Sequence, residues 1–217
     1  MSHLKILLAS RSPRRKELLE QLAISYETVD VAIDETVKAP IMPEVYVKNM
    51  AEKKAMKALA DYGQLISDKT ILLTADTTLS LNGEIIGKPE NREHFYEIMR
   101  KLSNSTHTVF SALTLVGHEK IESIDATDHN IIHHSVKEKF VTMLSESEVT
   151  FSFLPDNFIE NYWLSGEPCD KAGGYAIQGM MAGYIQSIKG SYSGIMGLPL
   201  FELRKALEEF DYYLMSN

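Results

Sequence analysis

Two short clusters carry side chains suited to phosphate chemistry, one near the N-terminus and the other within a central apolar run. The first, Ser10-Arg11-Ser12-Pro13-Arg14-Arg15, stands where an apolar run ends and a helical pattern begins. A helix N-terminus presents free N–H groups and partial positive charge to a phosphate, and guanidinium groups add bidentate hydrogen bonds. This turn, which holds three arginines, is therefore a candidate phosphate site. A solvated basic helix start is the alternative.

The second cluster, Ala75-Asp76-Thr77, lies inside the otherwise apolar run 70–81. A carboxylate within a buried strand costs free energy unless it binds a metal, a cation or a substrate. Asp76 is thus a candidate metal ligand or base, and a structural cap is the alternative. A third cluster, Gly87-Lys88-Pro89, places a lysine in a turn, where lysines are usually solvated.

The fourth cluster is the segment from Gly166 to Gly179, which combines four glycines with a lysine, two acids and a glutamine. Glycine allows the backbone to approach a ligand closely, and the amide of Gln178 can both donate to and accept from a base edge. The glycine spacing matches neither a Walker P-loop nor a dinucleotide fingerprint. Together the four clusters supply cations, a carboxylate and a polar base reader, which a nucleotide-phosphate site requires.

Strands that alternate with helices must position these clusters. The pattern predicts strands at 4–9, 26–33, 70–81, 108–116 and 184–188, and helices at 13–22, 43–60, 90–102, 155–164 and 198–210. Asn82-Gly83 predicts a hairpin turn, so an all-parallel sheet is not expected. The fold class predicted is α/β, with a mixed sheet flanked by helices, in one domain over residues 1–217.

Composition limits the classes of function. The net charge of −8 argues against a general nucleic-acid binder, while a few focused cations can still hold a small anion. The single cysteine, Cys169, excludes an internal disulfide framework and fits a reducing compartment. Residues 6–9 form too short an apolar stretch for a signal peptide or a membrane span. We therefore expect a cytoplasmic protein without membrane contact.

One long polar segment does not fit the pattern. Residues 117–150 carry His129, His133 and His134, and we interpret them as an extra surface segment. Two histidines four residues apart can ligate a metal, but a solvated surface position is the favoured interpretation because no acidic motif accompanies them.

These motifs, in this order, resemble those of the Maf proteins, a family of nucleoside triphosphate pyrophosphatases. The resemblance covers nearly the whole chain and rests on five motifs: 10–19, 75–77, 87–89, 166–179 and Gly197-Leu198-Pro199-Leu200. It implies an inosine-triphosphatase-like fold with two lobes around a central cleft, and a homodimer. It also implies water attack on the α-phosphate with a divalent metal, Mg²⁺ or Mn²⁺. The segment 117–150 is longer than the family usually has.

The resemblance assigns roles to individual residues. Asp76 matches the proton acceptor, and Glu35 matches an acidic position near the metal, so Glu35 and Asp76 are the metal candidates. The substrate-binding candidates are Ser10, Arg14, Arg15, Lys54, Thr77, Lys88 and Gln178. Among them Arg14, Thr77 and Gln178 match the specificity positions of the dTTP/UTP pyrophosphatases, and Lys54 and Lys88 match phosphate-contacting lysines.

The function that the resemblance implies is hydrolysis of dTTP and UTP to the monophosphate and pyrophosphate. The implied biological role is sanitation of the nucleotide pool. Two alternatives stay open. One is a pyrophosphatase for modified purine nucleotides such as 7-methyl-GTP. The other is a non-catalytic regulator of cell division, against which the combination of Asp76, Lys54 and Lys88 argues.

Overall fold

The computed structural model describes residues 4–36, 40–124 and 132–214. Its strands are β1 (Lys5–Ala9), β2 (Ser25–Val29), β3 (Thr70–Leu81), β4 (Glu84–Ile86), β5 (Thr106–Ile124), β6 (Ile132–Phe151) and β7 (Ile185–Lys189). Its α-helices are α1 (Pro13–Gln21), α2 (Pro43–Tyr62), α3 (Arg92–Leu102), α4 (Asp156–Leu164), α5 (Tyr192–Met196) and α6 (Leu200–Glu208). Short 3₁₀ turns occupy Gly63–Leu65, Ala172–Gly174 and Met180–Tyr184.

The strands form one mixed seven-stranded sheet in the order β2-β1-β3-β5-β6-β7, with β4 paired to β3. β1 is parallel to β2 and β3, whereas the β3–β4, β3–β5, β5–β6 and β6–β7 pairs are antiparallel. The predicted α/β class with a mixed sheet and flanking helices is therefore confirmed.

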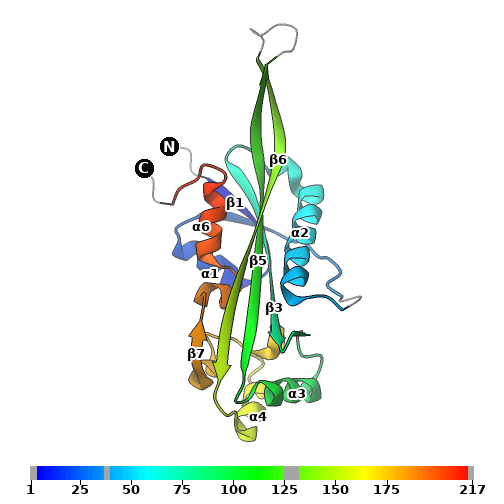
Figure 1. Ribbon diagram of the computed structural model, residues 1–217, viewed down its shortest axis with the longest axis vertical. Helices are drawn as coiled ribbons and strands as arrows, with labels where there is room; N and C mark the ends of the chain where they lie inside the picture. Colours follow the sequence, from blue (N-terminus) through cyan, green and yellow to red (C-terminus); the bar gives the residue numbers. More distant parts are fainter. Residues whose placement is uncertain (1–3, 37–39, 125–131, 215–217) are drawn as a thin grey trace.

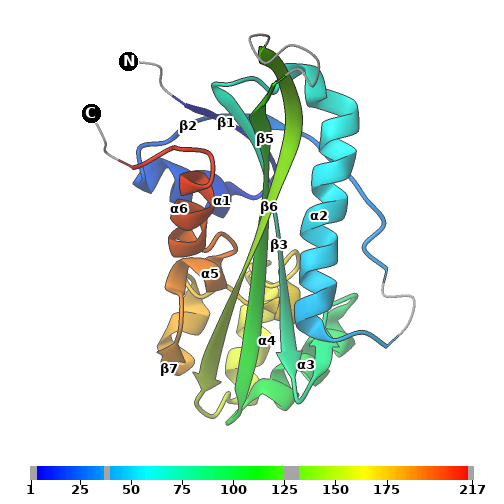
Figure 2. The same cartoon turned by 45° about the horizontal axis from the view of Figure 1, so that its top comes forward.

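Helices cover both faces of the sheet (Figures 1 and 2). Alternate side chains of β1 explain how: Ile6 and Leu8 pack in the cluster that includes α1 and α6, while Leu7 and Ala9 pack against α2. A separate cluster around Phe95 joins α3 and α4 to the far ends of β3, β5 and β6. Two-sided burial of this kind makes β1 and β3 nearly continuous apolar runs.

Local sequence signals explain several element boundaries. Pro13 opens α1 after Ser12, although the Ser12 side chain makes no capping hydrogen bond. Asn91 caps α3 by accepting from the backbone N–H of His94. Asn82 and Gly83 both have positive φ, at 53° and 83°, which confirms the predicted hairpin turn between β3 and β4.

The interpretation of residues 117–150 as an extra surface segment is wrong for much of its length. β5 and β6 pair along their whole lengths, and Ser145, Ser147 and Val149 are buried in the sheet. Only the distal ends of the strands β5 and β6 themselves project beyond the body of the molecule (Figure 1). His129 lies outside the described residues, and His133 and His134 belong to β6.

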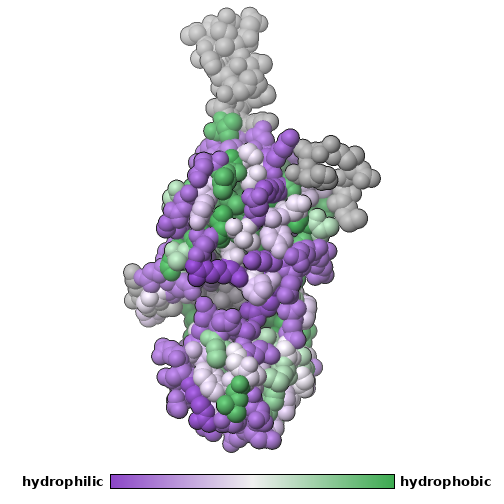
Figure 3. Space-filling view, turned by 180° about the vertical axis from the view of Figure 1, so that it is seen from behind, coloured by the Kyte–Doolittle hydropathy of each residue, from purple (hydrophilic) through white to green (hydrophobic). Residues whose placement is uncertain are grey.

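The surface seen from behind is mostly hydrophilic, with smaller hydrophobic patches between the polar areas (Figure 3). None of the helices in the described ranges has the length and apolar character that crossing a lipid bilayer requires.

Candidate active site

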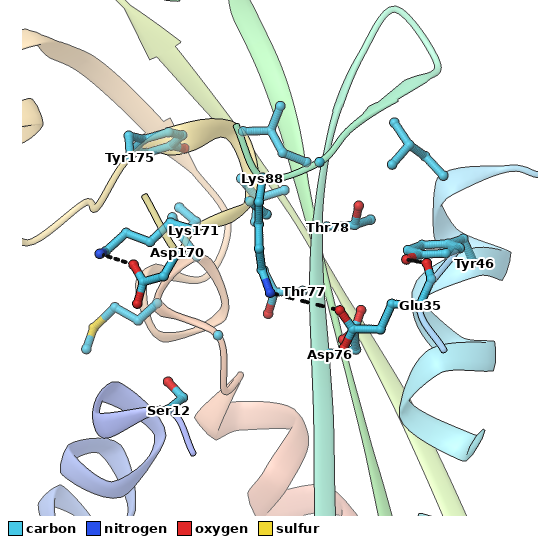
Figure 4. A pocket seen from close by; sticks show the side chains of 18 of the residues that line it. Ser12, Glu35, Tyr46, Asp76, Thr77, Thr78, Lys88, Asp170, Lys171 and Tyr175 are labelled. Carbon is cyan, nitrogen blue, oxygen red and sulfur yellow. Dashed lines mark hydrogen bonds and ion pairs between the residues drawn. The ribbon is translucent and has the colours of Figure 1, made fainter. Parts of the chain in front are cut away.

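A cavity of about 740 Å³ opens beside the middle of β3. β1 pairs with β3 as far as Leu73, and β4 pairs from Leu79 onward, so Asp76 lies in the interval between them. The cavity lining includes Arg14, Arg15, Glu35, Lys54, Asp76, Thr77 and Lys88. The structure thus gathers seven of the predicted site residues from five separate segments. Figure 4 labels Glu35, Asp76, Thr77 and Lys88 among them.

Asp76 and Thr77 point to opposite faces of β3, because side chains alternate along a strand. Asp76 faces α2, where its Oδ1 lies 2.6 Å from Nζ of Lys54. Thr77 faces α5, and its Oγ1 lies 2.8 Å from Oγ of Ser111 on β5. The two adjacent residues therefore serve different parts of the same cavity.

Lys54 joins two carboxylates. Its Nζ lies 2.6 Å from Oδ1 of Asp76 and 2.6 Å from Oε1 of Glu35, while Lys88 lies 4.0 Å from Oε2 of Glu35. The side chain of Lys54 is only 13% exposed, whereas that of Lys88 is 60% exposed. Lys54 is thus the buried cation of this group and Lys88 the solvated one.

The pKa values of the two carboxylates, Asp76 and Glu35, are shifted in opposite directions. Burial raises the pKa of Asp76, and the charge and hydrogen bond of Lys54 only partly oppose that effect. Burial also raises the pKa of Glu35, but the hydrogen bond and charge of Lys54, with Lys88 and Arg15, outweigh it, so the pKa is lowered. Asp76 is therefore the better proton acceptor of the pair.

The strand-to-helix turn after β1 supplies the arginines. Arg15 donates from Nε to the carbonyl of Gly197 at 2.8 Å and from Nη1 to Oγ of Ser10 at 3.1 Å. Burial lowers the pKa of Arg15, which the charge of Asp76 partly offsets. Within the described residues, Nε of Arg14 is buried and has no hydrogen-bond partner, so it has donor capacity left for a ligand.

The structure explains the presence of Gly197 and Ser10 in their sequence motifs. Gly197 ends α5 with a φ of 113°, a conformation that favours glycine, and this places its carbonyl against Arg15. Ser10 does not line the cavity; it contacts Arg15 instead and supports that side chain indirectly.

The loop from Gly166 to Gly179 forms the opposite wall. Asp170, Lys171 and Tyr175 line the cavity, and Lys171 donates to Asp170 at 2.6 Å. These three residues were not singled out individually from the sequence, although they lie within the glycine-rich cluster. Gln178, in contrast, is exposed and is absent from the described lining, so the structure does not bring this predicted base reader to the cavity.

Tyr46 is a lining residue that sequence reasoning missed. Its hydroxyl donates to the backbone carbonyl of Glu35 at 2.9 Å, which ties the loop carrying Glu35 to α2. Burial, together with the charges of Asp76 and Glu35, raises its pKa to about 12. A tyrosine in the first turn of an amphipathic helix gives no sequence signal that separates it from core packing.

The donor set fits a hard divalent cation. Mg²⁺ prefers oxygen ligands, and proteins commonly hold it with one or two carboxylates together with substrate phosphates. Asp76 and Glu35 provide two such carboxylates within reach of one nitrogen. Among the described residues, no group of three or more His, Cys, Asp or Glu side chains could hold a metal ion, so water and phosphate oxygens would complete the coordination.

The chain is similar in sequence to known proteins along nearly its whole length. The sequence model of the Maf-like protein family matches residues 5–210. A dTTP/UTP pyrophosphatase of Alkalilimnicola ehrlichii is 41% identical over 210 residues, covering 95% of this chain and 93% of the relative. The dTTP/UTP pyrophosphatase of Clostridium perfringens is 36% identical, covering 98% of this chain and all (100%) of the relative.

A third relative, the dTTP/UTP pyrophosphatase of Pseudoalteromonas atlantica, is 38% identical and covers 93% of this chain and 95% of its own length. Each of these similarities covers almost the whole of both chains. On the family match and these relatives, the chain belongs to the Maf-like protein family.

Proposed function

We propose that this protein hydrolyses dTTP and UTP to the nucleoside monophosphate and pyrophosphate. The observation that carries the proposal is the position of Asp76, a buried carboxylate with a raised pKa that faces the cavity beside Lys54 and close to Arg15. The curated relatives named as dTTP/UTP pyrophosphatases support the choice of substrates.

In the proposed reaction, the cations of the cavity and the carboxylate of Asp76 have separate roles. Arg14, Arg15, Lys54 and Lys88 form a cationic end that suits a triphosphate. Asp76 accepts a proton from water as the water oxygen attacks the α-phosphorus, and the bond from that phosphorus to the bridging oxygen breaks. The cations stabilise the negative charge that develops on the departing pyrophosphate.

A divalent ion, Mg²⁺ or Mn²⁺, belongs to the proposal, with Asp76 and Glu35 as the residues that would hold it. When bound, it supplies positive charge to the phosphate oxygens. Lys54 already holds both carboxylates at 2.6 Å, which keeps them oriented toward the same point of the cavity.

We also propose that the protein is a cytoplasmic homodimer that removes unwanted nucleotides from the pool. The family resemblance supports the dimer, and a single, exposed cysteine fits a reducing compartment. Light scattering of the purified protein at several concentrations tests the dimer.

A panel of nucleotides tests the activity. Pyrophosphate release is measured for dTTP, UTP, CTP, GTP and 7-methyl-GTP with Mg²⁺ present. We expect dTTP and UTP to give the highest kcat/KM. A preference for 7-methyl-GTP would mean that the substrates are modified purine nucleotides and not pyrimidine nucleotides. Absence of pyrophosphate release from every nucleotide would contradict the enzymatic function and favour a regulatory role.

A further inference from the structure

The hydroxyl of Thr77 lies at the junction between the charged and the apolar parts of the cavity. Thr77 and Leu79 share one face of β3, and the apolar lining nearby comes from Val109, Ile195 and Met196. A flat, weakly polar base fits against this apolar part when the triphosphate occupies the cationic end. Thr77 contributes a polar atom, Oγ1, to the lining on the same face of β3 as Leu79.

Ser111 determines which way the Thr77 hydroxyl points its hydrogen. Oγ of Ser111 lies 2.6 Å from the carbonyl oxygen of Gly194 and 2.8 Å from Oγ1 of Thr77. A carbonyl can only accept, so the single hydrogen of Ser111 goes to Gly194. Thr77 must then donate its own hydrogen to Ser111, because two oxygens at this distance need a hydrogen between them.

This arrangement leaves Thr77 with only lone pairs to offer the cavity. Ser111 is 1% exposed, and its position on β5 is fixed by the pairing of Thr77 with Ser111 across the β3–β5 ladder. Water therefore has little access to Ser111 to provide an alternative partner. The polarity of the Thr77 hydroxyl is set by the fold before any ligand binds.

We propose that Ser111 is a positioning residue that makes Thr77 an obligate hydrogen-bond acceptor, and that Thr77 thereby selects bases with a ring N–H. The inference rests on the proposed function. The ring nitrogen N3 of uracil and thymine carries a hydrogen, whereas N3 of cytosine carries a lone pair and would face the lone pairs of Thr77. Such a mismatch leaves the lone pairs of both atoms without a hydrogen-bond partner in a part-buried site, which is disfavoured.

The test compares Ser111→Ala with wild type. Removing the Ser111 hydroxyl frees the Thr77 hydrogen to rotate toward the cavity, so Thr77 can donate to cytosine N3. We expect the ratio of kcat/KM for UTP over CTP to fall by about tenfold, mainly because CTP improves. Ser111→Thr keeps a hydroxyl at this position and should restore the wild-type ratio.

Ser145→Ala is the matched control. Ser145 is also buried, and it pairs with Ser111 across β5 and β6, so its loss perturbs the same region of the sheet. We expect its UTP/CTP ratio to equal that of wild type. A second probe, N3-methyl-UTP, lacks the ring N–H and should be a poor substrate for wild type.

Binding measurements separate this inference from the proposed function. Calorimetric titration of wild type and Ser111→Ala with UTP and CTP reports the same preference without turnover. Binding of UTP without pyrophosphate release would contradict the enzymatic function, while the change in the UTP/CTP affinity ratio would still decide the role of Ser111. An unchanged ratio in Ser111→Ala, equal use of N3-methyl-UTP and UTP, or failure to bind either nucleotide would each overturn the inference.

Discussion

Lys54 and Asp76 meet across the packing of α2 on β3, with Nζ of the lysine 2.6 Å from Oδ1 of the aspartate. The same nitrogen lies 2.6 Å from Oε1 of Glu35, so one ammonium compensates two carboxylates. Both members of the Lys54–Asp76 pair are nearly buried, at 13% and 12% side-chain exposure, and solvent screens their interaction only weakly. The charge balance of this part of the cavity therefore depends on this pair.

Asp76→Asn should preserve the fold and remove most of the activity. The substitution keeps the shape of the side chain but deletes the proton acceptor, whose loss typically costs about 10² to 10⁴-fold in rate. Pyrophosphate release from dTTP measures the effect, and a thermal melt checks folding. Asp61→Asn, which neutralises an exposed carboxylate on α2, is the control and should remain fully active. Near-normal turnover by Asp76→Asn would contradict the assigned role.

Removal of divalent ions should stop turnover. Chelator is added to the purified protein, and Mg²⁺ or Mn²⁺ is then supplied in excess. We expect activity to disappear and return, because two carboxylates and the phosphates provide the oxygen ligands that such ions prefer. Undiminished pyrophosphate release in chelator would show that Asp76 and Glu35 have another purpose.

Lys54→Met and Lys88→Met should differ in severity. Lys54→Met leaves two carboxylates facing each other without their buried cation, and we expect kcat/KM to fall on the order of a hundredfold. Lys88 is 60% exposed, so solvent screens its charge, and Lys88→Met should cost about tenfold or less. Steady-state kinetics on dTTP compare the two variants. Equal losses would mean that burial does not distinguish the lysines.

His107 should make stability depend on pH. Its Nε2 lies 2.8 Å from the Tyr175 hydroxyl, and burial lowers the pKa of His107 from 6.5 to about 4. The unfolded chain therefore binds this proton first, so stability is retained above pH 6.5 and is lost as the pH falls toward 4. The loss attributable to this group is at most about 3 kcal/mol.

His107→Gln tests that dependence, because glutamine retains a polar group beside Tyr175 but does not titrate. Urea unfolding at several pH values between 4 and 7 gives the free energy of unfolding for both proteins. The variant should lose less stability than wild type across this range. Parallel curves would show that His107 does not carry the effect.

Gln178→Ala decides between the sequence-based interpretation and the structure. Because the Gln178 side chain is exposed outside the lining of the cavity, we expect kcat/KM for dTTP and UTP to change less than about twofold. A loss of about tenfold confined to these two nucleotides would instead support base reading by Gln178. CTP and GTP provide the comparison.

The sequence identified Asp76 and the glycine-rich wall because both break a local rule. A carboxylate in an apolar run and a dense set of glycines with polar residues are unusual for packing alone. β6 was missed because its inward-facing residues include Ser145 and Ser147 rather than apolar side chains. Their burial depends on partners distant in sequence, such as the backbone N–H of Ser191, which donates to Oγ of Ser147 at 2.9 Å.

The donor and acceptor roles at Thr77 were equally inaccessible. They depend on Ser111, which lies 34 residues away along the chain, and on Gly194, which lies farther still. Tyr46 could not be predicted as a lining residue either. Its hydroxyl bonds to the Glu35 carbonyl, a contact between a helix and a loop that sequence periodicity does not predict. Sequence patterns thus revealed which side chains are chemically costly, while tertiary contacts determined their partners.

Asp76 belongs to the middle of a twelve-residue strand, not to a loop. Central strands open to solvent only when the whole domain unfolds, whereas loops and termini fluctuate locally at much lower cost. The carboxylate that we propose as the general base is therefore exposed by heating only when the sheet itself unfolds. Heating should not produce a folded but inactive intermediate through local melting at this position, and enzyme stored below its unfolding temperature keeps its proton acceptor in place for as long as it remains native.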